Sequence, residues 1–421
     1  MIEESGTLEK LLRTMRRIIP SSVFRALVPI YHWKLAMLGA IVYGFPSRKL
    51  KVIAVTGTKG KSTTTYMIAR VFEEQGIAVA AIGSLGYKIR ERKWPNTLKM
   101  TMPGRMKLQK FLREAVNAGC THVVLEATSE GIAQHRLAGV RVDCAVFTNI
   151  HPEHIESHGN FKNYKAAKLR LFKKTKNIHV LNGDDPYFKE FRGVPAMQTY
   201  VYGMEKGVIN QRERQIKLKL AGDFNIYNAL ATLDVVHAYG LDERKAQNTI
   251  ESIETIPGRM EFIQREPFAV VVDYAHTPQS LELVYETLSE KRKAKSEKHG
   301  KLICVLGSAG GGRDTWKRPK FGEIAAKYCD EIVLTNEDSW DEDPDKIVEE
   351  IFSGAISNKL EAVSIKKILD RKEAIQVAID DAKPGDTVII TGKGSETSMA
   401  LAGGKKIPWS DAEIVRDILK G

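Results

Sequence analysis

Short apolar runs alternate with segments of helical periodicity from residue 51 to about residue 256, and a second alternation continues from residue 257 to the end. Alternation of this kind predicts right-handed βαβ units and a mostly parallel sheet in each part. The runs that predict strands are 51–56, 78–82, 122–126, 143–148, 268–273, 302–307, 331–335 and 387–391. The segments that predict helices include 61–75, 105–118, 164–173 and 242–253. We therefore predict an α/β protein with a central domain over 51–256 and a C-terminal Rossmann-like domain over 257–421.

A glycine-containing loop follows the first predicted strand and opens the first predicted helix. Glycines let the backbone fold closely around a phosphate, and the helix adds its positive N-terminal end. Lys61 brings a charge to the outer phosphates, and the hydroxyl of Ser62 or Thr63 can hold Mg²⁺. The glycines stand closer together than in the usual G-x-x-x-x-G-K-[ST] loop, and a plain glycine turn with a solvated lysine is the weaker interpretation. The sequence thus predicts a nucleoside triphosphate site formed by Gly57, Thr58, Lys59, Gly60, Lys61, Ser62 and Thr63.

The first 50 residues have a different pattern. They hold two apolar helical segments separated by Pro20, and the apolar run 35–45 is too short to span a bilayer. Basic residues interleaved with Tyr31, Trp33 and Tyr43 would suit a segment that lies on a membrane surface. We favour the alternative, a helical extension over 1–50 that packs on the next domain.

The composition, with 43% hydrophobic and 28% charged residues, is typical of a soluble globular protein. The net charge of +12 is scattered in local clusters without an aromatic platform or a nucleic-acid motif, so solvated helix faces are favoured over nucleic-acid binding. The four cysteines stand far apart with no C-x-x-C pair, which indicates buried thiols in a reducing compartment. Without a recognisable signal peptide, we expect a cytoplasmic protein, with peripheral contact at the inner membrane face as an option.

Several polar residues fall where predicted strands end, which is the edge where open α/β sheets bind ligands. Glu126 ends one strand, and Thr148 and Asn149 end the next. The histidines and glutamates around His154 include a proline and lack the helical pair of zinc hydrolases, so Mg²⁺ is favoured over zinc. Lys168 lies on a predicted helix, where periodicity alone favours a solvated charge.

Two asparagines and two arginines are further candidates for ligand binding. Asn225 and Asn228 open a helix, where contact with a base and helix capping are equally good interpretations. Arg259 and Arg313 are single arginines in glycine-containing turns, where contacts to carboxylate or phosphate are common. For each arginine alone, a solvated charge is an equal alternative.

These segments together resemble the Mur ligase family, ATP-dependent amide-forming enzymes of cell-wall precursor assembly, and most of all its UDP-N-acetylmuramoyl-tripeptide synthetases. The motifs occur in family order from residue 51 onward, over about nine-tenths of the chain. They are Thr56-Gly-Thr-Lys-Gly-Lys-Ser-Thr63, Leu125-Glu-Ala-Thr-Ser129, Phe147-Thr-Asn149 with residues 154–159, Ala166-Ala-Lys168, Asn182-Gly-Asp-Asp-Pro186, Gly222-Asp-Phe-Asn-Ile-Tyr-Asn228, Pro257-Gly-Arg-Met-Glu261, Asp273-Tyr-Ala-His-Thr-Pro278, Arg313-Asp314 with Lys317-Arg-Pro319, and Gly392-Lys-Gly394.

The resemblance implies a role for each matching residue. Lys168 would be carbamylated and, with Glu126 and His154, would bind a second Mg²⁺. The residues implied to bind ATP are Asn225, Asn228, Arg259, Asp273 and His276. The residues implied to contact substrates are Thr128, Ser129, Arg136, Arg313, Glu337, Asp338, Trp340, Gly392 and Glu396.

Three departures from the family pattern bear on the substrates. Fifty residues before the phosphate loop are too few for the family's uridine-nucleotide domain, so we expect a lipid-linked or otherwise altered acceptor to bind better than a UDP-linked one. Trp340 stands where an arginine selects diaminopimelate, which favours lysine or another amino acid, with Glu337, Asp338 or Asp341 as partners for a side-chain amine. Ser395 and Glu130 also replace the family's usual histidines.

The prediction is a monomeric ligase that phosphorylates a muramoyl-peptide-like carboxylate with ATP and then couples it to a free amino acid. Two alternatives stay open from the sequence. One is a ligase related to folylpolyglutamate synthase, which also lacks the uridine domain. The other is a non-catalytic, ATP-dependent protein that binds at the membrane.

Overall fold

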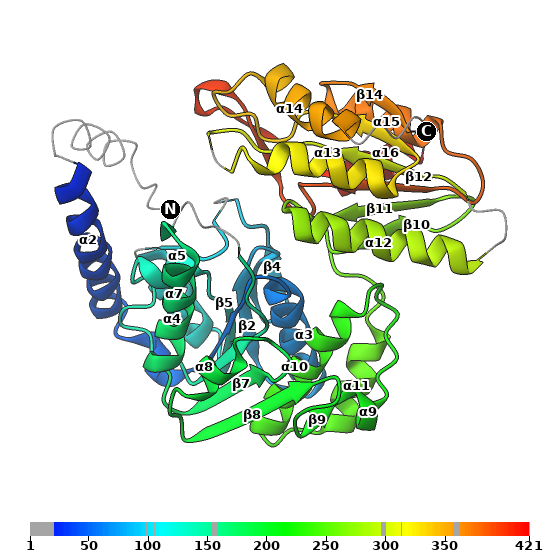
Figure 1. The fold of residues 1–421 in the computed structure, drawn as a ribbon. Helices are drawn as coiled ribbons and strands as arrows, with labels where there is room; N and C mark the ends of the chain where they lie inside the picture. Colours follow the sequence, from blue (N-terminus) through cyan, green and yellow to red (C-terminus); the bar gives the residue numbers. More distant parts are fainter. Residues whose placement is uncertain are drawn as a thin grey trace.

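The computed structural model describes residues 21–97, 100–104, 106–152, 158–295, 300–312, 314–357 and 363–420. Two separate sheets, each covered by helices, lie one above the other, with the C-terminal sheet uppermost in Figure 1. This arrangement confirms the predicted α/β class with a mostly parallel sheet in each part.

The central part of the chain is built on a nine-stranded sheet in the order β4-β3-β2-β5-β1-β6-β7-β8-β9. Its neighbouring strands are parallel except for β2–β3 and β3–β4. The strands are β1 (Lys51–Thr56), β2 (Val79–Gly83), β3 (Gly86–Ile89), β4 (Arg92–Trp94), β5 (His122–Glu126), β6 (Cys144–Phe147), β7 (Ile178–Asn182), β8 (Gln198–Gly203) and β9 (Ile209–Asn210).

Helices bury both faces of this sheet, which explains why its central strands are almost continuously apolar. One face is covered by α4 (Met106–Asn117), α5 (Ser129–Ala133), α7 (Phe161–Lys174) and α8 (Phe188–Arg192). The other face is covered by α3 (Lys61–Glu74), α10 (Phe224–Ala238) and α11 (Glu243–Ser252), and the short α9 (Gln211–Arg214) follows β9. Because β1 lies between β5 and β6, the loops after these strands meet at one edge.

The C-terminal part is built on a six-stranded sheet in the order β10-β11-β15-β12-β13-β14, parallel except for β10. Its strands are β10 (Glu261–Gln264), β11 (Ala269–Asp273), β12 (Leu302–Leu306), β13 (Glu331–Leu334), β14 (Ser364–Lys367) and β15 (Thr387–Thr391). One face packs on α12 (Pro278–Lys295), α13 (Lys317–Tyr328) and α14 (Pro344–Ser357), and the other on α15 (Arg371–Asp380) and α16 (Asp411–Ile418). Between β15 and α16 lie β16 (Ser398–Ala400), η2 (Ala402–Gly404) and β17 (Lys406–Pro408).

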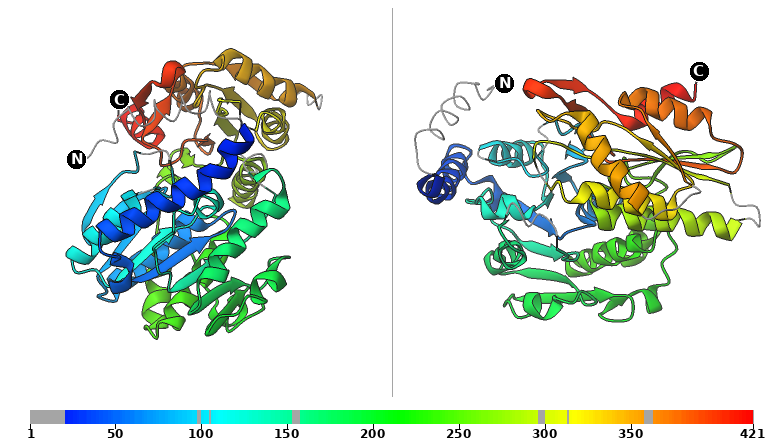
Figure 2. Two further views of the ribbon diagram at one scale, coloured as in Figure 1. Left: turned by 90° about the vertical axis from the view of Figure 1, so that its left-hand side faces the viewer. Right: turned by 45° about the horizontal axis from the view of Figure 1, so that its top comes forward.

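The chain before β1 forms α2 (Ser21–Val42) and η1 (Pro46–Lys49). Helix α2 lies against α4 and runs along the outside of the molecule, as Figure 2 shows. Among the residues that the structure describes, no helix has both the length and the apolar character needed to cross a membrane.

The structure corrects the expectation that all four cysteines are free thiols. Cys304 in β12 and Cys329 before β13 form a disulfide, with their Cα atoms 6.1 Å apart. The two strands are neighbours in the sheet, so residues separated by 25 positions in the chain come side by side. Cys120 and Cys144 are free and buried, as predicted.

Candidate active site

The phosphate loop has two glycines that no other residue can replace without displacing a neighbour. A Cβ atom on Gly57 would lie 1.8 Å from the Thr148 hydroxyl oxygen, and one on Gly60 would lie 2.2 Å from the Asn228 amide oxygen. Gly60 also has a φ of +80°, which favours glycine. Lys61 donates hydrogen bonds to the carbonyl oxygens of Gly57 at 3.0 Å and Thr58 at 2.8 Å, so its ammonium group lies over the loop.

A buried carboxylate lies beside the first turn of α3. Glu126 ends β5 opposite Val55 of β1 and is 2% exposed. One of its oxygens accepts from the Ser62 hydroxyl at 3.1 Å, and the other accepts from the backbone N–H and the hydroxyl of Ser84 at 2.8 and 3.0 Å. Thr63 follows Ser62 on α3 and is buried. The fold therefore brings Glu126 and Ser62 into contact.

A guanidinium group reaches this cluster from the start of the C-terminal part. Arg259 donates to the hydroxyl oxygens of both Ser62 and Ser84 at 3.1 Å. A cation thus already lies beside a set of hydroxyl and carboxylate oxygens, which is the kind of ligand that Mg²⁺ prefers. The hydroxyl oxygens of Ser62 and Ser84 and the carboxylate of Glu126 are therefore suitable ligands for a divalent cation at this position.

Lys168 is one of the largest fully buried side chains of the structure, at 1% exposure. Its ammonium group donates to the Gly57 carbonyl at 2.6 Å and lies 4.6 Å from the centre of the Tyr164 ring. The Tyr164 hydroxyl in turn is 2.9 Å from the Thr58 hydroxyl. The interpretation of Lys168 as a solvated helix charge is therefore wrong, because this face of α7 packs against the phosphate loop.

The predicted asparagines connect α10 to the same loop. The Asn228 amide oxygen accepts from the Thr64 hydroxyl at 3.2 Å, and its amide nitrogen donates to Asn225 at 3.1 Å. Asn225 donates in turn to the Ala221 carbonyl at 2.7 Å. Both asparagines are buried, and these bonds fix α10 against the helix that carries the loop.

Asp273 and His276 follow β11 and shape the turn next to Arg259. The two oxygens of Asp273 accept from the backbone N–H groups of Met260 and Ala275, each at 2.7 Å. Burial raises the pKa of the Asp273 carboxyl, and Arg259 opposes that shift. The His276 ring lies 2.7 Å from the Tyr274 carbonyl through Nδ1. Asp273 thus orders the turn that presents Arg259.

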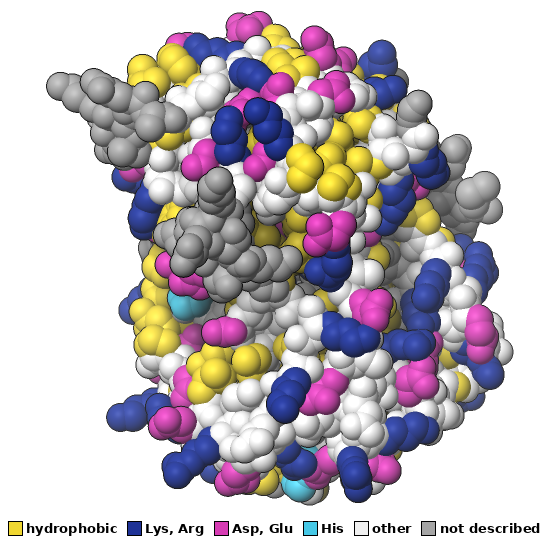
Figure 3. Space-filling model, turned by 90° about the vertical axis from the view of Figure 1, so that its right-hand side faces the viewer, with side chains coloured by type: hydrophobic (Ala, Val, Ile, Leu, Met, Phe, Trp, Pro, Cys, Tyr) yellow, Lys and Arg dark blue, Asp and Glu magenta, His cyan; other side chains and the backbone are white. Residues whose placement is uncertain are grey.

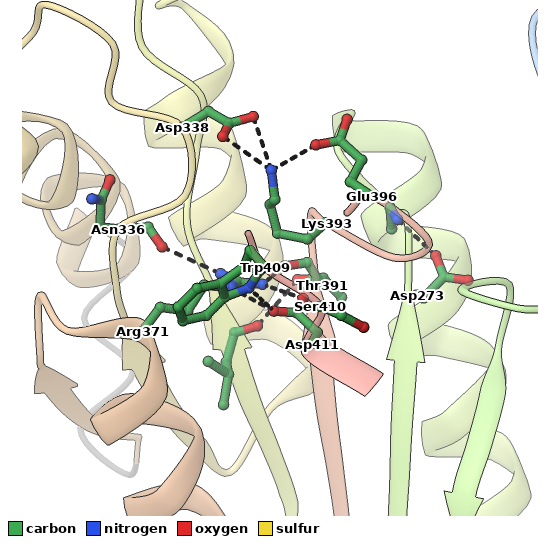
Figure 4. A network of polar contacts seen from close by, with 12 residues as sticks. Asp273, Asn336, Asp338, Arg371, Thr391, Lys393, Glu396, Trp409, Ser410 and Asp411 are labelled. Atoms are coloured by element: carbon green, nitrogen blue, oxygen red, sulfur yellow. Dashed lines mark hydrogen bonds and ion pairs between the residues drawn. The ribbon is translucent and has the colours of Figure 1, made fainter. Parts of the chain in front are cut away.

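A second polar cluster lies at the ends of β13 and β15 (Figure 4). The ammonium group of Lys393 is 3.0 Å from both oxygens of Asp338 and 2.6 Å from Glu396. Gly392 has a φ of +107°, and a Cβ atom there would lie 2.2 Å from the Glu337 carboxylate. Burial raises the pKa of Glu337 to about 7, against the opposing charges of Arg371 and Lys393.

Tyr274 connects the two clusters. The Arg259 guanidinium lies 4.6 Å from the centre of the Tyr274 ring, and the Tyr274 hydroxyl donates to Glu396 at 3.3 Å. The polar chain from Glu126 to Lys393 is therefore continuous through these side chains. Sequence reasoning missed Ser84 and Tyr274 as site residues, although both follow strands and the rule that found Glu126 would have found them.

The remaining substrate candidates lie in different surroundings. Thr128 caps α5 by accepting from the Gly131 N–H at 3.1 Å, and the Ser129 hydroxyl lies 3.1 Å from Nε2 of His158. Arg136 donates to the Met102 carbonyl and the Gln134 side chain. These residues form a separate group beside α5. His154 and Arg313 lie outside the described residues.

An open pocket of about 620 Å³ borders the loop that contains Trp340. Trp340 has a φ of +53°, which is unusual for a bulky residue. The pocket is lined by Gly311, Gly312, Thr315, Arg318, Asp341, Glu342, Lys346 and Glu350. Arg318 is 1% exposed and pairs with Glu342 and Glu350. Asp341 is a further carboxylate of the pocket lining, and it accepts from the Gly403 N–H at 2.8 Å.

No group of three or more His, Cys, Asp or Glu side chains suited to a metal ion occurs within the described ranges. His154, the predicted third ligand beside Glu126 and Lys168, falls in the gap 153–157. A phosphate loop backed by a buried carboxylate, a buried lysine and an arginine from a second sheet defines an enzyme that uses a nucleoside triphosphate.

Comparison with known proteins identifies the family. The Mur ligase middle domain matches residues 55–236, and the Mur ligase glutamate ligase domain matches residues 258–394. The UDP-N-acetylmuramyl-tripeptide synthetase of Roseiflexus sp. (strain RS-1) is 36% identical over 93% of this chain and 83% of that protein. The UDP-N-acetylmuramoyl-L-alanyl-D-glutamate--2,6-diaminopimelate ligase of Aquifex aeolicus (strain VF5) is 36% identical over 90% of this chain and 79% of that protein.

Solved structures agree with this result. A UDP-N-acetylmuramoyl-L-alanyl-D-glutamate--2,6-diaminopimelate ligase superposes with a TM-score of 0.57 at 29% identity, over 88% of this chain and 78% of that one. Folylpolyglutamate synthase of Mycobacterium tuberculosis gives a TM-score of 0.65 at 17% identity, over 86% and 92%, and shares the fold. The chain belongs to the Mur ligase family, and it is an ATP-dependent, ADP-forming ligase of peptidoglycan precursor synthesis.

Proposed function

We propose that this ligase adds a free amino acid to the carboxylate of a muramoyl peptide through an acyl phosphate. The observation that carries the proposal is the continuous polar chain from Glu126 at the phosphate loop to Lys393 in the C-terminal part. Such a chain supports a phosphorylation site and an amine site that lie next to each other. The names of the relatives, a tripeptide synthetase and a diaminopimelate ligase, support a peptide-forming reaction.

Each part of the chain has its own task in this proposal. Residues 51–256 bind ATP and the acceptor carboxylate, residues 257–421 bind the amino acid, and residues 1–50 form an extension. The reaction takes place in the cytoplasm, where ATP is present. Thr128, Ser129 and Arg136, beside α5, are proposed to contact the muramoyl peptide.

In the first step, the acceptor carboxylate attacks the γ-phosphorus of ATP, and ADP leaves. This step needs positioning and charge neutralisation more than covalent chemistry. Lys61 and the amides of residues 57–60 hold the phosphates, and Arg259 adds a positive charge beside Ser62. Ser62 or Thr63 would hold one Mg²⁺, and Glu126, His154 and a carbamate of Lys168 would hold a second. Bound there, the ions would supply charge neutralisation between the two anionic reactants.

In the second step, the neutral amine of the amino acid attacks the acyl carbon, and inorganic phosphate leaves. Phosphate is a far better leaving group than oxide, which is why the carboxylate must be phosphorylated first. The amine is proposed to bind at the polar cluster of Lys393, Asp338 and Glu396 (Figure 4). Cationic groups beside the reacting carbon would stabilise the tetrahedral oxyanion.

The amino acid is proposed to be lysine or another residue without a second carboxylate. Trp340 cannot form the bidentate contact that an arginine gives to such a carboxylate. Of the three predicted amine partners, Asp338 is already paired with Lys393, whereas Asp341 lines the open pocket. We therefore assign the side-chain amine to Asp341, with Glu337 buried behind Gly392.

The test is mass spectrometry of the products formed from ATP, mixed amino acids and a panel of acceptors. The panel contains UDP-linked and lipid-linked muramoyl dipeptides and a folate, so that it also tests the ligase type of folylpolyglutamate synthase. We expect a muramoyl tripeptide with lysine or another amino acid lacking a second carboxylate, together with ADP. A folate product, or no acceptor-dependent ADP release, would overturn the proposal, and preferential use of diaminopimelate would overturn the assignment of Trp340 and Asp341.

A further inference from the structure

Over residues 30–42, whose side chains are described, helix α2 faces the protein with small residues and turns several large apolar residues outward. Ala36, Gly39 and Ala40 are buried on the side next to α4. A Cβ atom on Gly39 would lie 3.0 Å from the Met106 Cα atom, and one on Gly139 would lie 2.4 Å from the Ala40 Cβ atom. The helix therefore packs closely through its small residues, and Tyr31, Leu35 and Met37 are partly buried beside them.

The outward face consists of large apolar side chains that are 45 to 60% exposed, namely Ile30, Trp33, Leu38, Ile41 and Val42. They are five of the eleven large hydrophobic side chains that are exposed among the described residues. A surface helix ordinarily turns such residues toward the core and polar ones toward water. An exposed apolar face of this kind, here with Lys34 among its members, marks a surface that a partner covers.

The charges on the chain segment that carries this face have one sign. From Lys10 to Phe72 the sequence contains no aspartate or glutamate, whereas Lys34, Arg48 and Lys49 are exposed lysines and arginines. On the face of the molecule opposite α2, by contrast, Figure 3 shows basic and acidic side chains interspersed. The net positive charge of the chain is therefore unbalanced by acids along this particular segment.

A basic pocket lies beside the C-terminal end of α2. Its volume is about 450 Å³, and its lining residues are Phe45, Ser47, Arg48, Gly139, Val140, Arg141 and Lys174. Three of these residues are basic and none is acidic. The Ser47 hydroxyl accepts from the Arg141 N–H at 3.0 Å, which holds η1 and the loop before β6 together as the two sides of the pocket. Gly139 lies both in this lining and under Ala40, so the pocket and α2 are adjacent.

We propose that α2 and this pocket dock the protein on an anionic phospholipid surface, with the helix in the interface and a lipid phosphate in the pocket. Trp33 is suited to the interface because its ring is apolar and its N–H can reach water, and the long stem of Lys34 lets its ammonium group extend toward the head groups. A second copy of the chain is a poor occupant, since two such basic surfaces would repel each other. The helix lies on the membrane and does not cross it.

The first experiment measures co-sedimentation of the full chain with phosphatidylcholine vesicles, with and without phosphatidylglycerol. We expect binding that requires phosphatidylglycerol and weakens as salt is raised, because screening reduces attraction to the anionic surface. This comparison uses the unaltered protein, so it does not depend on how any variant folds. Absence of binding, or equal binding to both kinds of vesicle, would overturn the proposal.

The second experiment separates the apolar face from the pocket. Ile41→Ser is expected to lower the vesicle partition constant about ten-fold, because burial of one large aliphatic side chain raises such a constant by about that factor. Arg48→Ala with Arg141→Ala is expected to lower it about five-fold for each charge removed. The matched controls are Ile356→Ser on α14, whose side chain is 52% exposed, and Arg244→Ala with Lys245→Ala on α11.

The controls are expected to bind as the unaltered chain does, and all variants are expected to keep its melting temperature and its ATP-dependent ligation of a soluble acceptor. Equal losses in the controls would overturn the proposal, because binding would then be a general property of the surface. Full binding by the α2 and pocket variants would also overturn it. A dimer in light scattering that Ile41→Ser dissociates would assign the face to a second copy instead.

Discussion

Lys168 shows how much the surroundings of one residue decide its chemistry. Its ammonium group is buried against the Gly57 carbonyl, at the edge where the phosphate loop meets Glu126. If a carbamate of Lys168 binds metal, Lys168→Ala abolishes ligation, and a small added carboxylic acid partly restores it by replacing the carbamate. We expect a loss in kcat of at least about 100-fold, the upper range for removal of a group that supports a metal site.

The measurement is the rate of ADP release with acceptor and amino acid present, with and without added formate or acetate. Lys165→Ala serves as the control, because Lys165 lies on the same helix and pairs with Glu190 at the surface of the central part. It should keep nearly full activity and show no response to the acid. Full activity of the unsupplemented Lys168→Ala variant would remove Lys168 from the mechanism.

Asp234 is a buried carboxyl for which no hydrogen-bond partner is found among the described residues. Burial raises its pKa to about 8, with Glu243 adding to the shift. Between pH 4 and 8 the folded protein therefore keeps a proton that the unfolded chain has lost, so stability falls as pH rises through this window. Asp234→Asn removes this ionisation and should stabilise the fold more at pH 8 than at pH 5, by about 1–3 kcal/mol.

Thermal unfolding at the two pH values measures this effect. Glu286→Gln, at an exposed position of α12, is the control and should change the melting temperature little at either pH. The assignment fails if Asp234→Asn lowers stability equally at both pH values, since that result would mean a lost hydrogen bond.

At the scale of elements, a buried ion pair joins the first residues of two helices in the C-terminal part. Arg371 starts α15, Asp411 starts α16, and the guanidinium donates to both carboxylate oxygens at 2.9 and 2.7 Å (Figure 4). Both side chains are 0% exposed. Removing one partner leaves an uncompensated buried charge, so Asp411→Asn should lower the free energy of unfolding by about 3–5 kcal/mol.

Denaturant unfolding of three variants tests this pair. Asp417→Asn, which breaks the exposed pair of Asp417 on α16 with Lys420 beyond its end, should cost less than about 1 kcal/mol. Arg371→Met combined with Asp411→Leu should be less destabilised than Asp411→Asn alone, because no charge is left unpaired. Equal effects of Asp411→Asn and Asp417→Asn would contradict the argument.

The sequence predicted those elements whose pattern is local. Buried parallel strands such as 122–126 and 387–391 are continuous apolar runs, and they were found with their bounds unchanged. The short antiparallel strands β3 and β4 are polar and partly exposed, so no periodicity marks them. At the site, Glu126 was predictable because it ends a strand. The disulfide of Cys304 depends on which strands become neighbours, and sequence spacing does not show this.

At the scale of the whole molecule, the two sheets are linked at the site by a few side chains. Lys59 of the phosphate loop donates to the Thr277 hydroxyl at 2.6 Å, and Arg259 reaches Ser62 and Ser84 while stacking on Tyr274. A lysine at position 259 keeps the charge but loses the planar fork and the stacking. Arg259→Lys should therefore lower kcat/KM for ATP by about 10- to 100-fold, or about 1.4–2.7 kcal/mol of transition-state stabilisation.

Steady-state kinetics with ATP and the amino acid as varied substrates test this link. Arg265→Lys is the matched control, because the Arg265 guanidinium also lies over a ring, 4.3 Å from the centre of Phe262 in β10, instead of over Tyr274. It should keep the kinetics of the unaltered chain. Since Arg259 contacts Tyr274 and Tyr274 contacts Glu396, the Arg259→Lys variant should also raise KM for the amino acid. An effect on ATP alone would show that the two clusters act independently, although they are connected in space.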